Sequence, residues 1–111
     1  MAVMNVEVFA LQPTAKDTPL SADEQFTVDL CFTTALAALN DHTSPDLRVI
    51  SCDVIPYATG ALIQLLTLAP SADHVTDAVA QRLHTAMAND GALFAGWELA
   101  AGNVAVWSSD N

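Results

Sequence analysis

Positively charged side chains are scarce in this sequence of 111 residues. The only Lys and Arg residues are Lys16, Arg48 and Arg82. Asp and Glu together number thirteen, so the formal net charge is −10. Nucleic acids are bound through clusters of Lys and Arg that displace counterions from the phosphates, and anionic membranes attract the same residues. The scarcity argues against both as partners and leaves basic or neutral proteins. An acidic surface also aids solubility by itself.

Long apolar runs are missing as well. No stretch approaches the roughly 18 apolar residues of a membrane span, and residues 1–10 lack the basic start and long apolar run of a signal peptide. Cytoplasmic residence is therefore expected, although a processed or internal fragment would look the same. Hydrophobic residues make up 52% and charged residues 14%, and this length suits one hydrophobic core. We expect a single soluble domain over residues 1–111.

Motifs for catalysis or metal binding are also lacking. Cys31 and Cys52 form no CxxC motif and no metal-ligand spacing, so we interpret both as small core residues. His74 and Asp77 offer two ligands at helical spacing, but His84 lies about 15 Å further along the axis. There is no GxSxG motif and no glycine-rich phosphate loop among four glycines. We assign no catalytic residue, no metal ligand and no cofactor, and an enzyme is the less favoured interpretation.

The pattern that is present predicts alternating strands and helices. Ser21 and Glu24 form the signature of a capping box at the start of a helix. Gly102-Asn103 suggests a turn, which makes the last segment either a closing hairpin or one bent strand. The predicted elements are a strand over 2–10, a helix over 21–40, strands over 47–57 and 61–69, a helix over 71–89, and the closing segment over 97–107.

This order predicts an α+β fold of the ferredoxin-like βαββαβ type. The strands would form an antiparallel sheet with both helices on one face. We also predict an extra C-terminal strand, which the closing segment forms if it is a hairpin. The segment from Arg48 to Val106 also resembles a SEA-type ferredoxin-like domain, through hydrophobic pattern and not through a specific motif. The turn reads Thr59-Gly60-Ala61 and lacks the serine that such domains use for self-cleavage, so we assign no family on this resemblance.

Apolar residues occupy positions where a solvated surface is expected. On the first helix, Phe26, Leu30 and Ala37 lie almost opposite the core stripe. Trp107 falls on the sheet face opposite Leu99, and the two middle strands are apolar on both sides. In one interpretation the preceding loop or the C-terminal tail covers these residues; in the other they contact another chain. We predict a protein interface at Phe26, Leu30, Ala37 and Trp107, with a homodimer or higher oligomer as its simplest form.

A second group of residues is a candidate pocket. Asp53 is the one acid inside an apolar strand, and Tyr57 and Trp97 are aromatic residues that can line a cavity. Arg48 precedes Asp53 by five residues, which places the two on opposite faces of a regular strand.

The sequence therefore favours a non-enzymatic, acidic protein-interaction domain that self-associates or docks as a small subunit of a larger assembly. One alternative is an acidic inhibitor or immunity-type protein that neutralises a basic target. Another is a small-molecule enzyme or binder of the dimeric α/β-barrel type, with its pocket near Asp53, Tyr57 and Trp97.

Overall fold

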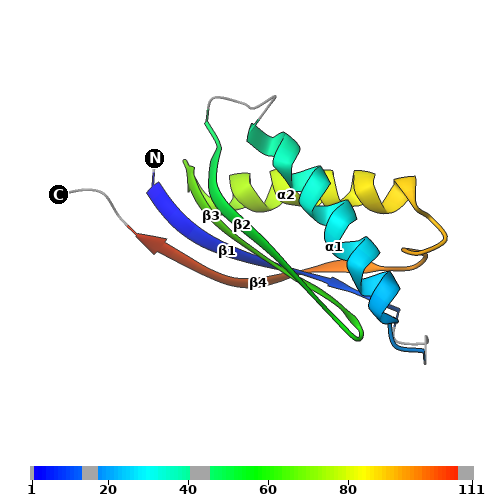
Figure 1. Ribbon diagram of the computed structural model, residues 1–111. Helices are drawn as coiled ribbons and strands as arrows, with labels where there is room; N and C mark the ends of the chain where they lie inside the picture. Colours follow the sequence, from blue (N-terminus) through cyan, green and yellow to red (C-terminus); the bar gives the residue numbers. More distant parts are fainter. Residues whose placement is uncertain (1, 14–17, 41–45, 108–111) are drawn as a thin grey trace.

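The chain folds as an α+β domain with the element order β-α-β-β-α-β (Figure 1). The computed structural model describes residues 2–13, 18–40 and 46–107, so Lys16 and His42 lie outside the described residues. The elements are β1 (Ala2–Leu11), α1 (Ala22–Ala37), the short 3₁₀ helix η1 (Ala38–Asn40), β2 (Arg48–Tyr57), β3 (Gly60–Ala69), α2 (Ala72–Asn89) and β4 (Glu98–Trp107).

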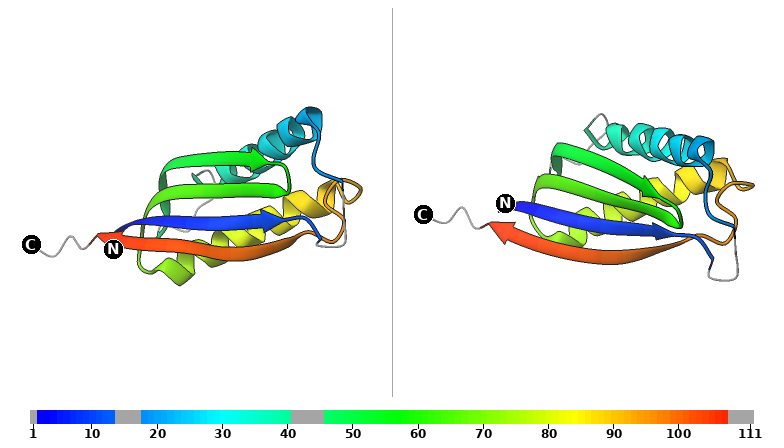
Figure 2. Two further views of the ribbon diagram at one scale, coloured as in Figure 1. Left: turned by 90° about the horizontal axis from the view of Figure 1, so that it is seen from below. Right: turned by 60° about the horizontal axis from the view of Figure 1, so that its bottom comes forward.

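The four strands form one antiparallel sheet in the order β2-β3-β1-β4. β1 and β3 are central, while β2 and β4 are the edge strands. Both helices lie on one face of the sheet, as Figures 1 and 2 show. α1 packs mainly over β2, and α2 packs over β1, β3 and β4. No described helix or strand covers the opposite face, which we call the open face.

Burial alternates along the central strands because successive side chains of a strand point to opposite faces. On β1 and β3, every second residue faces the helices and is buried. These residues meet the inner stripe of each helix and form the core. The main members are Met4, Val6, Val8 and Ala10 of β1, Ile63 and Leu65 of β3, Val28, Phe32 and Leu36 of α1, and Val75, Val79 and Leu83 of α2.

Each long helix begins with a side chain that caps its free amides. The Ser21 amide donates to Glu24 Oε1 at 2.9 Å, and the Glu24 amide donates to Ser21 Oγ at 3.1 Å, which completes the predicted capping box. Ser71 Oγ accepts from the His74 amide at 3.2 Å at the start of α2. The predicted starts of both helices are therefore confirmed.

The prediction of an extra C-terminal strand is wrong. Residues 98–107 form the single strand β4, which pairs with β1 along its length except for a register shift between Val6 and Val8. Gly102 fits there because an added Cβ would lie 2.8 Å from the Cβ of Glu7 and 3.0 Å from its carbonyl oxygen. The Asn103 amide donates to Glu7 Oε1 at 3.3 Å. The glycine and asparagine thus form a bulge within one strand and not a turn between two.

Trp97 belongs to the core and not to the sheet. It precedes β4, is only 7% exposed, and meets Phe94 edge to face with the ring centroids 4.9 Å apart. Phe94 in turn stacks on Phe32 of α1 at 5.2 Å. This aromatic cluster closes the core where the segment after α2 returns to the sheet.

Candidate functional site

The four predicted interface residues are all exposed, but they lie in two places. Phe26 is 68% exposed and Leu30 57% exposed on the outer side of α1, where Ala37 is exposed too. The described part of the preceding loop therefore leaves Phe26 and Leu30 open to solvent. Trp107 is 51% exposed at the end of β4. These residues mark one apolar area on the helix layer and another on the sheet.

The three predicted pocket residues are not brought together. Trp97 lies in the aromatic cluster of the core, on the helix side of the sheet. Asp53 is exposed in the middle of β2, opposite Gln64, and Tyr57 is half-buried at the end of the same strand. The pocket predicted from Asp53, Tyr57 and Trp97 is therefore not formed by these side chains.

The open face of the sheet is largely apolar. Residues that are cross-strand partners share a face, so the registers define rows across the four strands. None of the side chains in these rows is fully buried. The rows are Ile55–Leu62–Phe9–Ala100, Asp53–Gln64–Glu7, Ser51–Leu66–Asn5–Ala105 and Arg48–Leu68–Val3–Trp107.

One of these rows is acidic. Glu7 Oε2 accepts from Gln64 Nε2 at 2.9 Å, and Asp53 is the next residue beyond Gln64 in the row. Arg48 lies on the same face as Asp53, contrary to the prediction from a regular strand. A register shift between Val49 and Ser51 inserts an extra residue and reverses the expected alternation.

The outer edge of β2 is protected against pairing with another strand. The Asn40 side chain binds Val49 as a strand would: its Nδ2 donates to the Val49 carbonyl at 3.1 Å, and its Oδ1 accepts from the Val49 amide at 3.0 Å. The register shift after Val49 bends the strand, Pro56 has no amide hydrogen, and Arg48 and Asp53 carry charge. Natural sheets use all of these features to block edges.

The outer edge of β4 has no such protection over residues 103–107. This half-strand, Asn103 to Trp107, contains no charged residue and no proline, and no described strand pairs with its outer side. Its side chains are exposed on both faces. Val104 and Val106 are 45% and 56% exposed on the helix side, although their partners on β1 are core residues. Trp107 is exposed on the open face.

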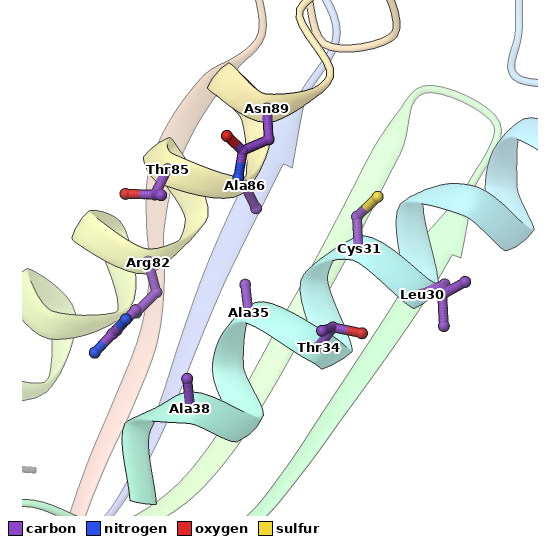
Figure 3. Close-up of a pocket in the computed structure, with 9 residues that line it drawn as sticks. All are labelled: Leu30, Cys31, Thr34, Ala35, Ala38, Arg82, Thr85, Ala86 and Asn89. Carbon is purple, nitrogen blue, oxygen red and sulfur yellow. The ribbon is translucent and has the colours of Figure 1, made fainter. Parts of the chain in front are cut away.

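A groove of about 350 Å³ separates the two helices on the outer surface of the helix layer (Figure 3). Most of the residues that line it are small, so the helix backbones leave room between them. Its α1 side consists of Leu30, Cys31, Thr34, Ala35 and Ala38, and its α2 side of Arg82, Thr85, Ala86 and Asn89.

Both cysteines are free thiols that pack against the core without being fully buried. The prediction that they lie in the core thus needs correction, because each retains some contact with solvent. Burial raises the pKa of the Cys52 thiol, and the negative charge of Asp53 adds to this. Burial and the charge of Asp90 likewise raise the pKa of Cys31. Raised pKa values keep both thiols protonated and poorly nucleophilic near neutral pH.

No protein-family model, curated protein or solved structure matches this chain. Within the described ranges, no group of three or more His, Cys, Asp and Glu is placed to hold a metal ion. Neither helix of the described structure is long and apolar enough to cross a membrane. The features that bear on function are therefore the outer edge of β4, the open face of the sheet and the groove between the helices.

Three features of these surfaces were not identified from the sequence. The pairing of the Asn40 side chain with Val49, which we call the Asn40 clamp, depends on a contact between residues nine positions apart, and periodicity does not reveal it. Val104 and Val106 are exposed although their β1 partners lie in the core, and strand alternation alone does not reveal this. The position of Arg82 in a groove had one available signal, since it is the only cation in the second helix.

Proposed function

We propose that this chain is a protein-interaction subunit that joins a second copy of itself through residues 103–107 of β4. The observation that carries the proposal is the contrast between the two sheet edges. β2 is blocked by the Asn40 side chain, a register shift and Pro56. The half-strand from Asn103 to Trp107, by contrast, is uncharged and mainly apolar, and no described strand pairs with its outer side. Such an edge is a template for pairing with another chain.

A two-fold axis at Ala105 gives a consistent antiparallel pairing. Asn103 then lies opposite Trp107 of the second copy, and Val104 lies opposite its Val106. The valine pairs cover each other on the helix side of the joined sheet, which is where both are exposed. Cross-strand β-branched pairs are stabilising. The product is an eight-stranded sheet in which the protected β2 strands form both outer edges.

The contact proposed here is small. Five residues per chain bury less than the roughly 1,200 Å² of a standard interface. We therefore expect a dimer that dissociates in the micromolar range and exchanges quickly, which suits a subunit that assembles reversibly.

Sedimentation velocity over a micromolar concentration series tests the proposal, with two variants that add the same charge. Val106→Lys places an ammonium group on the proposed joining edge and should give a monomer. Ile55→Lys, on the protected strand β2, is the matched control because Ile55 is similarly exposed at 46%, and it should dimerise as the wild type does. A wild-type chain that remains monomeric throughout the series contradicts the proposal. So does a dimer that Ile55→Lys disrupts and Val106→Lys leaves intact, since that result places the contact on the open face.

The acidic row supports a second candidate function, the binding of a basic protein on the open face. Asp53 and Glu7 flank Gln64, and the neighbouring rows are fully apolar on one side and half apolar on the other. This arrangement fits a partner that presents Lys or Arg between apolar side chains, and a second copy of the same face would bring like charges together.

A helical peptide in which lysines and leucines alternate from one turn to the next is a suitable probe for this second function. Asp53→Asn should weaken its binding several-fold, and Asp77→Asn on the exposed surface of α2 is the matched control. Equal effects of both changes would mean that the peptide responds only to net charge.

We further infer that the fold is of the ferredoxin-like type. The order of elements, the antiparallel sheet and the position of both helices on one face support this classification. Because that fold hosts unrelated functions, it adds no weight to either candidate function.

A further inference from the structure

The groove between α1 and α2 differs in charge from the rest of the molecule. Thirteen acidic residues are spread along the chain, yet none of the nine residues that line the groove is acidic. One of them, Arg82, is one of only three Lys and Arg in the sequence. The groove is therefore a place where an anion can approach this protein without meeting a carboxylate in the lining.

Arg82 is available for such an anion. Its guanidinium makes no ion pair or hydrogen bond with any residue that the structure describes, and the side chain is partly buried beside the groove. Figure 3 shows it extending from α2 into the space next to Ala38 of α1. A planar guanidinium with five donors is well suited to bind a carboxylate in a bidentate manner.

The two ends of the groove differ in charge. Asp90 follows α2 immediately after Asn89 and acts electrostatically on Cys31. Arg82 lies eight residues earlier, about 12 Å along the helix axis. A ligand with one anionic end is thus attracted to the Arg82 end and repelled from the Cys31 end.

The size and lining of the groove restrict the ligand further. Its volume of about 350 Å³ is at the lower end of the roughly 300–1,000 Å³ of small-molecule pockets. Between the charged ends the lining is mainly apolar. Ala35, Ala38 and Ala86 form it with Leu30, and the hydroxyl-bearing Thr34 and Thr85 interrupt it. The body of a fitting ligand is therefore short and apolar.

From these observations we propose that the inter-helix groove binds a small amphipathic carboxylic acid. The carboxylate pairs with the Arg82 guanidinium, and the apolar body lies along the alanines toward Cys31. The site is on the helix layer, away from the joining edge of β4, so it goes beyond the proposed self-association and does not depend on it.

Arg82 could serve a purely structural purpose, and the test must distinguish that role from ligand binding. α1 has no basic residue in its last turn, and a cation near a helix C-terminus interacts favourably with the helix dipole. If that is the whole role of Arg82, its removal lowers stability and changes no ligand affinity.

Calorimetric titration with octanoate tests the proposal, with 1-octanol as the uncharged probe of the same length. Octanoate should bind saturably with one site per chain, and 1-octanol at least about tenfold more weakly, because a hydrogen-bonded charge is lost. Arg82→Gln should weaken the binding of octanoate by a similar factor. Arg48→Gln, which removes a cation from the sheet face, should leave the affinity unchanged. Ala35→Leu fills the groove and should weaken the binding of both octanoate and 1-octanol.

A second measurement locates the ligand independently of affinity. Octanoate should slow the alkylation of Cys31, which lines the groove, and leave the alkylation of Cys52 on β2 unchanged. Thermal unfolding of each variant without ligand shows that it folds.

Three results would overturn the proposal: no saturable octanoate binding to the wild type, equal affinity for octanoate and 1-octanol, or unchanged octanoate affinity in a folded Arg82→Gln variant. None of these results bears on the sedimentation of the Val106→Lys variant, so the two proposals fail separately.

Discussion

Two buried side-chain nitrogens, Gln12 Nε2 and Trp97 Nε1, have no hydrogen-bond partner in the described structure. Leu11 pairs with Glu98 at the end of the β1–β4 ladder, so the next residues of the two segments, Gln12 and Trp97, lie at the same end of the sheet. A buried donor without an acceptor costs about 1–3 kcal/mol of stability. Substitution of either residue by an apolar side chain of similar shape can therefore stabilise the protein.

Gln12→Met replaces the unpaired amide by an apolar side chain of similar shape. We expect unfolding free energy to be unchanged or to rise by about 1 kcal/mol, since the desolvation cost disappears. Gln25→Met is the control, because Gln25 Nε2 donates to the Leu20 carbonyl at 3.2 Å, and it should destabilise by roughly 0.5–1.5 kcal/mol. Urea unfolding of the three proteins measures both effects. A clear loss of stability in Gln12→Met would show that the amide is paired in solution.

The Cys52 thiol links stability to alkaline pH. Burial, and then the charge of Asp53, raise its pKa in the folded chain, so the folded state holds this proton more tightly than the unfolded state. The corresponding stability is present below the unfolded pKa of about 8.5. It is lost as the pH rises from there through the folded pKa, because the unfolded chain releases the proton first. Urea unfolding from neutral to alkaline pH should show the wild type losing stability relative to Cys52→Ala above that point. A stability difference that does not depend on pH would contradict this assignment.

At the scale of elements, the sheet edges show how this chain controls pairing. The Asn40 amide satisfies both outward-facing groups of Val49 on β2, while the outer side of β4 has no partner among the described residues. The difference implies that one edge is kept closed and the other is available.

Asn40→Ala tests the closed edge. The variant loses two exposed hydrogen bonds, and we expect a loss of about 1–2 kcal/mol in unfolding free energy. Asn89→Ala is the matched control, since the Asn89 side chain makes no hydrogen bond to any described residue, and its effect should stay within about 0.5 kcal/mol. Equal stabilities of the two variants would mean that the clamp does not form in solution.

Several elements could be predicted because local patterns determine them. The capping box of Ser21 and Glu24 marks the start of α1, and the alternation of β1 predicts which residues face the core. The errors arise from long-range pairing. Gly102-Asn103 has the sequence of a turn, but β1 is long enough to pair with both halves of β4, so the two residues form a bulge. Likewise, the register shift in β2 places Arg48 and Asp53 on one face, which a regular alternation cannot predict.

The candidate sites were predicted less well than the fold, for a related reason. Helical periodicity places Phe26 and Leu30 opposite the core stripe, and they are exposed because the described part of the preceding loop does not cover them. Trp97, by contrast, was placed on a strand by its apolar neighbours, whereas its packing with Phe94 depends on how the segment after α2 returns to the sheet. A pocket or groove is formed by residues distant in sequence, and periodicity gives no information on which of them meet.

At the scale of the whole molecule, the net charge of −10 decides how association depends on salt. The molecule measures about 50 × 25 × 20 Å, so many charges of two joined copies lie within the Debye length of about 30 Å at 0.01 M salt. At 0.15 M salt the Debye length falls to about 8 Å, and most of this repulsion is screened. Self-association through the uncharged half of β4 should therefore become tighter as salt is added.

Binding of a basic partner to the acidic row has the opposite dependence, because screening weakens attraction between unlike charges. Sedimentation of the wild type, and titration with the lysine–leucine peptide, can both be carried out at low and at physiological salt. We expect the dimer to strengthen and the peptide complex to weaken between the two conditions. A dimer that weakens with added salt would show that charged groups hold the copies together. The uncharged segment from Asn103 to Trp107 could then not be the joining edge.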